Sequence, residues 1–262
     1  MTDLSRIRAV VFDAYGTVID FHNVEFRAAI AELLGNQRID LNSEEFYEGW
    51  VKLYGKASPW AGSFREGDPA NRERMLAGPL PEWHSTWDIW RRQFALAFEQ
   101  FGVEGDADAA ADHLRALLSH APPYADARET LERLDRAGYR LALLSNADED
   151  FLQSALSRGR LRFSAIQSSE ALRAYKPHRA VFVAICARLG CEPEEVLYVG
   201  DSPYADVNGG HRAGLATAWV RRSEGEPYPE QVPAPDLEVH SLAHLADVLC
   251  DRPAIAGTRG LA

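Results

Sequence analysis

Cysteine is scarce in this sequence, which has three in 262 residues. Cys186, Cys191 and Cys250 are too few and too scattered for a framework of disulfides or for a structural zinc site. Cys186 and Cys191 flank a helical stretch, so we expect them to be buried thiols.

Positive charge is in deficit, because 28 lysines and arginines face 39 acidic residues and the formal net charge is −11. Binding to a nucleic-acid backbone requires a basic face, and none is visible in the sequence. We therefore expect no nucleic-acid partner. A small anionic substrate remains compatible with this charge, since a few local donors outweigh a distant net charge. A homodimer is left open.

Long apolar runs are also missing. No stretch approaches the ~20 apolar residues that a membrane-spanning helix requires. The first residues lack the apolar run of a signal peptide. We expect a cytoplasmic protein with no membrane partner.

Short apolar runs that end in turn residues are present, and helical patterns lie between them, as over 127–137 and 181–189. Strands that alternate with helices form a parallel sheet that is covered on both faces. We therefore predict an α/β fold with a doubly wound parallel-sheet, Rossmann-like core built from residues 1–20 and 120–250. The strand-like runs are 9–12, 141–144, 165–166, 196–199 and 217–220.

Residues 22–118 differ from the rest, because they are mainly helix-favouring and hold five of the six tryptophans. We predict a helical insert after the first strand. Over 83–101, aromatic residues recur at three- and four-residue steps, which favours helix–helix packing; a wall that faces the substrate is the alternative. Residues 58–81 are predicted to be a loop and 251–262 a loosely ordered tail.

Polar residues follow the strand-like runs. In an open parallel sheet, ligands bind at the carboxyl ends of the strands. We therefore expect these residues to meet at one rim of the sheet. They are Asp13 and Thr17 after the first run, Ser145 and Asn146 after the second, Lys176 in a later loop, and Asp201 and Asp206 after the fourth run.

These side chains predict covalent hydrolysis. A carboxylate such as Asp13 can attack phosphorus and split one difficult step into two easier ones. The hard oxygen ligands of Asp13 and Asp201 suit Mg²⁺, which keeps several waters and shares a substrate phosphate. Lys176 and the backbone amides after Asp13 can balance the remaining charge.

Four stretches of the chain together resemble the ordered motifs of the haloacid dehalogenase superfamily. They read Phe-Asp-Ala-Tyr-Gly-Thr, Leu-Ser-Asn, Tyr-Lys-Pro and Val-Gly-Asp-Ser-Pro-Tyr-Ala-Asp. The resemblance covers the whole predicted core. The helical insert is similar in position to the cap domain that this superfamily carries between its first two motifs.

The resemblance implies a role for each matching residue. Asp13 would be the nucleophile and a metal ligand, and Lys176 would stabilise both the nucleophile and the phosphoryl charge. Thr17, Ser145 and Asn146 would hold the substrate, while Asp201 and Asp206 would bind Mg²⁺ directly or through water. The structural alternatives are that Ser145 is only a turn residue and that Asp206 only caps the next helix.

Tyr15 departs from the phosphatase pattern, in which a second Asp two residues after the nucleophile is the general acid and base. We place Tyr15 among the catalytic and metal-site positions. A phenol with an ordinary pKa near ~10 is a poor base at neutral pH, although it can donate a hydrogen bond. The Asp-Ala-Tyr-Gly-Thr sequence resembles the 2-haloacid dehalogenases, which expel halide and need no proton.

Other positions depart from the dehalogenase pattern. Trp50 is followed by Val51 and Lys52 rather than by an Arg, and Phe182 stands where a Tyr is usual. Asp201 stands where that pattern has Ser, and Pro203 where it has Asn. We predict a Mg²⁺-dependent phosphatase of a small phosphorylated metabolite that forms an aspartyl phosphate. A 2-haloacid dehalogenase and a catalytically weak phosphate-binding scaffold are the alternatives.

Overall fold

The computed structural model describes residues 4–58, 73, 76–80, 82–222 and 227–250. Most of the predicted loop over 58–81, and the whole predicted tail over 251–262, lie outside these residues. No described helix is both long enough and apolar enough to cross a membrane.

A six-stranded parallel sheet forms the centre of the molecule, with the strand order β3-β2-β1-β4-β5-β6. Five strands match the predicted runs, so the prediction of an α/β fold with a parallel sheet is confirmed. The sixth, β6, was not predicted, because it has three residues and only one of them is buried. The strands are β1 (Ala9–Phe12), β2 (Arg140–Ser145), β3 (Ala165–Ser168), β4 (Val196–Gly200), β5 (Ala216–Val220) and β6 (Leu237–Val239).

Alternate residues of each strand point to opposite faces of the sheet, and each face has its own apolar core. In β1, Val10 and Phe12 belong to one core, while Ala9 and Val11 belong to the other. All four side chains are fully buried. Burial on both faces explains why the strands read as continuous apolar runs.

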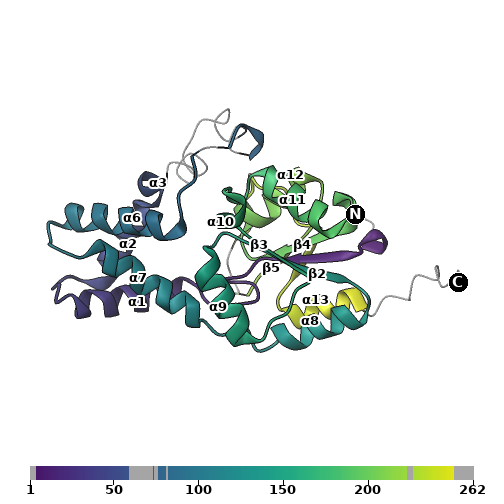
Figure 1. Cartoon of the computed structure of the whole chain (residues 1–262), viewed down its shortest axis with the longest axis horizontal. Helices are drawn as coiled ribbons and strands as arrows, with labels where there is room; N and C mark the ends of the chain where they lie inside the picture. Colours follow the sequence, from purple (N-terminus) through teal and green to yellow (C-terminus); the bar gives the residue numbers. More distant parts are fainter. Residues whose placement is uncertain (1–3, 59–72, 74–75, 81, 223–226, 251–262) are drawn as a thin grey trace, which may run out of the picture.

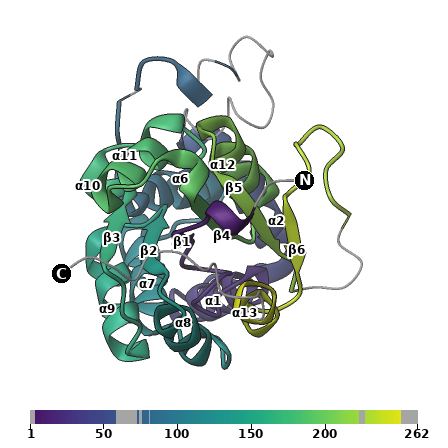
Figure 2. The ribbon, with the colours of Figure 1, turned by 90° about the vertical axis from the view of Figure 1, so that its right-hand side faces the viewer.

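Helices cover both faces of this sheet (Figures 1 and 2). One layer contains α10, α11 and α12, and the other contains α8, α9 and α13. These helices are α8 (Ala127–Arg136), α9 (Glu149–Gly159), α10 (Ser169–Leu172), α11 (Arg179–Leu189), α12 (Asn208–Ala213) and α13 (Leu242–Cys250), with the short segments η1 (Leu4–Arg6), η2 (Pro193–Glu195) and η3 (Pro203–Val207).

The described segments between residues 23 and 120 form helices, and we call them the insert. They lie together beside the sheet (Figure 1). That the insert is a separate domain with the predicted bounds stays a prediction. Its helices are α1 (Asn23–Asn36), α2 (Ser43–Lys52), α3 (Tyr54–Ala57), α6 (Thr86–Phe101) and α7 (Ala107–His120).

The aromatic stripe of α6 packs inside the insert and against the core. Trp90, Phe94 and Phe98 are buried, as helix–helix packing requires. The Trp90 ring stacks on Phe151 of α9, with 5.7 Å between ring centroids. Trp83 was wrongly assigned to this helix, because Ser85 caps the helix by accepting a hydrogen bond from the amide of Asp88.

Asp148 attaches the insert to the core. This buried carboxylate accepts hydrogen bonds from the backbone amides of Thr86 and Trp87, at 2.8 and 3.0 Å. The first amides of a helix have no hydrogen-bond partner within the helix, so a carboxylate from another segment can accept from them. Its negative charge also interacts favourably with the positive end of the helix dipole. The first turn of α6 is therefore held beside the loop that follows β2.

Cys186 and Cys191 are buried free thiols, as predicted. Burial, as the largest cause, raises the pKa of Cys186 to about 12, so this thiol stays protonated at neutral pH.

We expect Phe94→Ala to lower the free energy of unfolding by about 3–5 kcal/mol, because it leaves a cavity where a fully buried ring packed against Trp50 and Phe98. Urea denaturation measures this change. Val24→Ala is the control, since Val24 is 70% exposed and its truncation should change stability by less than ~0.5 kcal/mol. A loss below ~1 kcal/mol for Phe94→Ala would contradict the packing described here.

Candidate functional site

The site lies at the carboxyl ends of β1 and β4. The backbone amide of Asp13 donates to the carbonyl of Val199 at 2.8 Å, so the residue continues the pairing of these two strands. Only 7% of Asp13 is exposed. A parallel sheet leaves its ligand-binding crevice at this end, which is where the sequence predicted the site.

Lys176 joins two of the predicted carboxylates. Its Nζ lies 2.6 Å from Oδ1 of Asp13 and 2.7 Å from Oδ1 of Asp206. The lysine and both aspartates are buried. Because the ammonium holds Oδ1 of Asp13, Oδ2 is the oxygen that would attack a substrate in the predicted reaction.

Asp201 completes a group of three carboxylates. One oxygen from each of Asp13, Asp201 and Asp206 lies within 4.8 Å of the others. Asp201 packs against the backbone of Gly16, where a Cβ atom would overlap the Asp201 carboxyl group and where φ is +87°. The indole of Trp219 donates to the Asp201 carbonyl at 2.9 Å and fixes its backbone.

Three carboxylates in this space face one ammonium, and burial and crowding together shift the pKa values of these groups. Burial, as the largest cause, raises the pKa of Asp13 to about 6 although Lys176 opposes the shift. Burial and the charges of Asp13 and Asp206 raise the pKa of Asp201 well above its ordinary value. Burial alone would lower the pKa of Lys176, but Asp13 and Asp206 raise it well above its usual range.

This donor set fits a hard divalent cation. Carboxylate oxygens are the ligands that Mg²⁺ prefers, and a cation would relieve the repulsion among the three carboxylates. Asp13, Asp201 and Asp206 would hold the ion, as the sequence predicted. Metal binding at these residues stays a prediction.

Thr17 and Ser145, the predicted substrate-binding hydroxyls, are both buried near the ends of neighbouring strands. Among the described residues, the Thr17 Oγ1 atom has no hydrogen-bond partner. An unpaired buried hydroxyl is costly, so this atom is free to bond to a bound molecule. Their roles in binding stay predictions.

Asn146 contacts Lys176. Its Oδ1 accepts from the Lys176 amide at 2.7 Å, and its Nδ2 donates to the Lys176 carbonyl at 3.1 Å. The side chain therefore positions the lysine. This positioning role was not predicted; the predicted contact of Asn146 with substrate stays a prediction.

Asp206 does not cap the next helix, so the alternative raised for it is wrong. Its Oδ2 accepts from the amide of Ser202 at 2.9 Å, four residues earlier, and its Oδ1 binds Lys176. Helix α12 begins after Val207 without a side-chain cap. Ser202 instead caps the preceding segment η3, through the amide of Ala205.

Tyr15 directs its hydroxyl at two backbone carbonyls. It donates toward the carbonyls of Leu118 in the insert and Phe151 in α9, at 3.3 and 3.4 Å. Burial, followed by the Asp13 charge, raises the pKa of Tyr15 well above its ordinary value. The phenol therefore keeps its proton and links the insert to the core, while its predicted catalytic and metal-site roles stay predictions.

Arg222 was not among the site residues predicted from the sequence. It donates to the carbonyl of Thr17 at 2.7 Å and lies 3.3 Å from the ring centroid of Tyr124, where the chain returns from the insert. It also lies 3.7 Å from Asp126. Its position in the sequence could have identified it, because Arg222 follows β5 by two residues and so lies at the same rim of the sheet as the other site residues.

Comparisons with known proteins agree with this geometry. The haloacid dehalogenase-like hydrolase family matches residues 7–214. An (S)-2-haloacid dehalogenase 4A from Burkholderia cepacia is 29% identical over 248 residues, which cover 94% of this chain and 96% of the relative. The solved structure of L-2-haloacid dehalogenase from Xanthobacter autotrophicus is 25% identical, with a TM-score of 0.71 over 93% of this chain and 98% of that one.

Phosphatases also match, over a smaller part of the chain. A phosphoglycolate phosphatase from Haemophilus influenzae is 34% identical over 128 residues, or 48% of this chain and 57% of the relative. As a group, the comparisons favour the dehalogenase alternative over the phosphatase prediction. Both activities are hydrolytic, so the prediction of a hydrolase is confirmed.

We expect Asp201→Asn to raise the thermal midpoint in neutral metal-free buffer by ~2 °C or more. Burial and two neighbouring carboxylates oppose the ionisation of Asp201, so on folding this group must either take up a proton or keep an unfavourable charge, and the amide does neither. Asp206→Asn is the matched variant. It should lower the midpoint, because it takes away one of the two carboxylates that balance Lys176. Differential scanning fluorimetry in EDTA measures both shifts, and shifts of the same sign would contradict this charge balance.

Proposed function

Because the chain belongs to the haloacid dehalogenase-like hydrolase family, we propose that it is a Mg²⁺-dependent hydrolase of small phosphate esters with Asp13 as its nucleophile. Asp201 is the observation that carries this proposal. It brings a third carboxylate within 4.8 Å of Asp13 and Asp206, where one ammonium balances only part of the charge.

The charge of the site favours a reaction that uses a divalent cation. With the three carboxylates ionised, as cation binding requires, and Lys176 protonated, the group carries a net charge of −2. Without a cation such a site repels any anionic substrate, whether a haloacid or a phosphate ester, and it attracts a divalent cation. Val51 and Lys52 follow Trp50, so no Arg stands directly after this tryptophan to receive the carboxylate of a haloacid. A phosphate ester, by contrast, arrives where a bound cation offsets its charge.

The residues of the chain then have the following tasks. Oδ2 of Asp13 attacks phosphorus, the bond to the leaving oxygen breaks, and an aspartyl phosphate forms. Lys176 keeps Asp13 in place and stabilises charge on the phosphoryl oxygens, while the hydroxyls of Thr17 and Ser145 donate to them. Water then hydrolyses the aspartyl phosphate and returns the Asp13 carboxylate. Bound Mg²⁺ would supply further positive charge at the phosphoryl group.

Dehalogenation is the second candidate, and similarity along the whole chain favours it. The dehalogenase from Burkholderia cepacia matches 94% of this chain, insert included, whereas the phosphatase from Haemophilus influenzae matches 48%. Tyr15 also favours it, because halide leaves without a proton. In this reaction Asp13 would attack carbon and form an ester, which water would hydrolyse.

One pair of assays separates the candidates. We expect hydrolysis of p-nitrophenyl phosphate with Mg²⁺, loss of this activity in EDTA, and less than a few per cent of it in Asp13→Asn, whose amide cannot attack as an anion. We expect no chloride release from 2-chloropropionate in EDTA.

The opposite pattern, with metal-independent chloride release and no phosphate release, would reject the phosphatase proposal and support dehalogenation. If both activities are absent and phosphate still binds, the result would support the third alternative, a catalytically weak phosphate-binding scaffold. Circular dichroism of Asp13→Asn is the control for folding.

Tyr15 predicts a dependence on the leaving group. Its hydroxyl is engaged with the carbonyls of Leu118 and Phe151, so we assign no proton donation to it. General acid–base help is worth ~10²–10⁴ in rate and matters most for poor leaving groups. We therefore expect aryl phosphates to be cleaved much faster than alkyl phosphates, and Tyr15→Asp to raise the alkyl rate selectively.

Tyr15→Phe is the matched control, because it removes only the hydroxyl. The ratio of aryl to alkyl kcat should stay unchanged in this variant, while the thermal midpoint falls slightly. Alkyl phosphates cleaved as fast as aryl phosphates by the unmodified protein, or a changed ratio in Tyr15→Phe, would show that a proton donor is already present.

A further inference from the structure

A large groove lies at the end of the sheet opposite Asp13. Its walls are α8, the turn into β2 and the loop that joins α9 to β3, and its volume is about 860 Å³. Arg140 begins β2 and Ser164 directly precedes β3, so the groove opens at the amino ends of these strands. Asp13 follows the carboxyl end of β1.

The floor of this groove is apolar. The buried side chains of Leu131, Leu141 and Leu161 line it, and the partly buried rings of Tyr139 and Phe163 join them. A volume of this size falls within the range of ~300–1,000 Å³ that is usual for small-molecule sites. The groove therefore suits the apolar body of an organic ligand.

The rim of the groove is basic, in a chain whose net charge is −11. Four arginines line it, against two carboxylates from Glu132 and Asp135, so the lining carries a net formal charge of +2. Two of the arginines hydrogen-bond backbone carbonyls, which leaves their charge in place: Arg128 binds Gly159 and Arg140 binds Leu189.

Arg160 and Arg162 are exposed, and their guanidinium groups have no hydrogen-bond or ion-pair partner among the residues that the structure describes. Arg160 adopts a left-handed backbone conformation, with φ of 52°, at the end of α9, and Arg162 follows two residues later. Two guanidinium groups beside an apolar floor match a ligand with an anionic head and an apolar body.

We propose that this groove is a second binding site, separate from the Asp13 site, for a small organic anion with an aromatic or aliphatic body. Arg160 and Arg162 bind the anionic group, and the side chains around Phe163 hold the body. This inference is independent of the reaction at Asp13.

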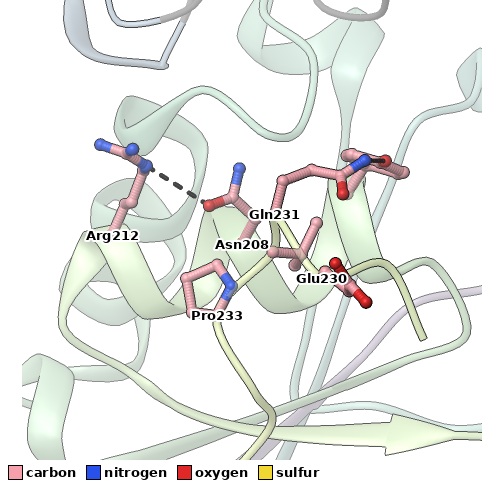
Figure 3. A pocket seen from close by; sticks show the side chains of 7 residues that line it. Asn208, Arg212, Glu230, Gln231 and Pro233 are labelled. Carbon is pink, nitrogen blue, oxygen red and sulfur yellow. Dashed lines mark hydrogen bonds between the residues drawn. The ribbon is translucent and has the colours of Figure 1, made fainter.

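A smaller cavity of about 240 Å³ beside α12 lacks these properties (Figure 3). Its guanidinium, Arg212, already binds Asn208 and the carboxylate of Glu73. Glu230 also lines this cavity, so it offers an anion no unbalanced positive charge.

The probe is 8-anilinonaphthalene-1-sulfonate, an aromatic anion whose fluorescence rises in apolar surroundings. We expect the double variant Arg160→Gln/Arg162→Gln to raise the Kd of this probe about tenfold or more, because it removes both unpaired guanidinium groups. N-phenyl-1-naphthylamine, which lacks the sulfonate, should bind both proteins equally weakly. Saturating phosphate with Mg²⁺ should not displace the sulfonate.

The matched control is Arg158→Gln/Arg179→Gln, which changes the net charge equally at two exposed arginines outside the groove. Its Kd for the sulfonate should equal that of the unmodified protein. An unchanged Kd in the groove variant, an equal loss in the control variant, or displacement of the probe by phosphate would overturn the proposal.

Discussion

The ion pairs of Lys176 with Asp13 and Asp206 are the interaction on which the site depends. They join three segments that are distant in the sequence: the end of β1, the loop before α11 and the segment η3 after β4. All three side chains are buried, so each charge needs the others, and loss of one partner leaves an uncompensated charge. Asn146 reinforces this arrangement, because it holds the backbone of Lys176 from the end of β2.

Asp201 lies outside this balance, and the proposed dependence on a metal ion rests on it. Two carboxylates and one ammonium would suffice for an Asp13 nucleophile that displaces halide. The third carboxylate packs against Gly16 and lies close to the other two. A bound cation would offset the repulsion among the three carboxylates. Similarity along the chain thus favours the dehalogenase candidate, whereas Asp201 supports the proposed phosphatase. The hydrolase family is common to both.

The sheet and most of the site could be predicted from the sequence, because buried parallel strands read as apolar runs and their carboxyl ends meet at one rim. Side-chain partners could not. Asn146 and Asp206 bond to backbone atoms that only the folded loops bring near them. The contacts of the Tyr15 hydroxyl with carbonyls of the insert and of α9 could not be predicted either, while the predicted site roles of Tyr15 stay predictions. Arg222 follows a predicted strand, but the significance of that position appears only when the loop containing Thr17 lies beside it.

Isothermal titration calorimetry with Mg²⁺ tests the central claim most directly, because it measures the cation at the three carboxylates without any assumption about the substrate. The account predicts one Mg²⁺ bound per chain, with a Kd at least tenfold higher in Asp201→Asn than in the unmodified protein, since each carboxylate contributes to the affinity. Absence of Mg²⁺ binding to the unmodified protein, or equal affinity in Asp201→Asn, would contradict it.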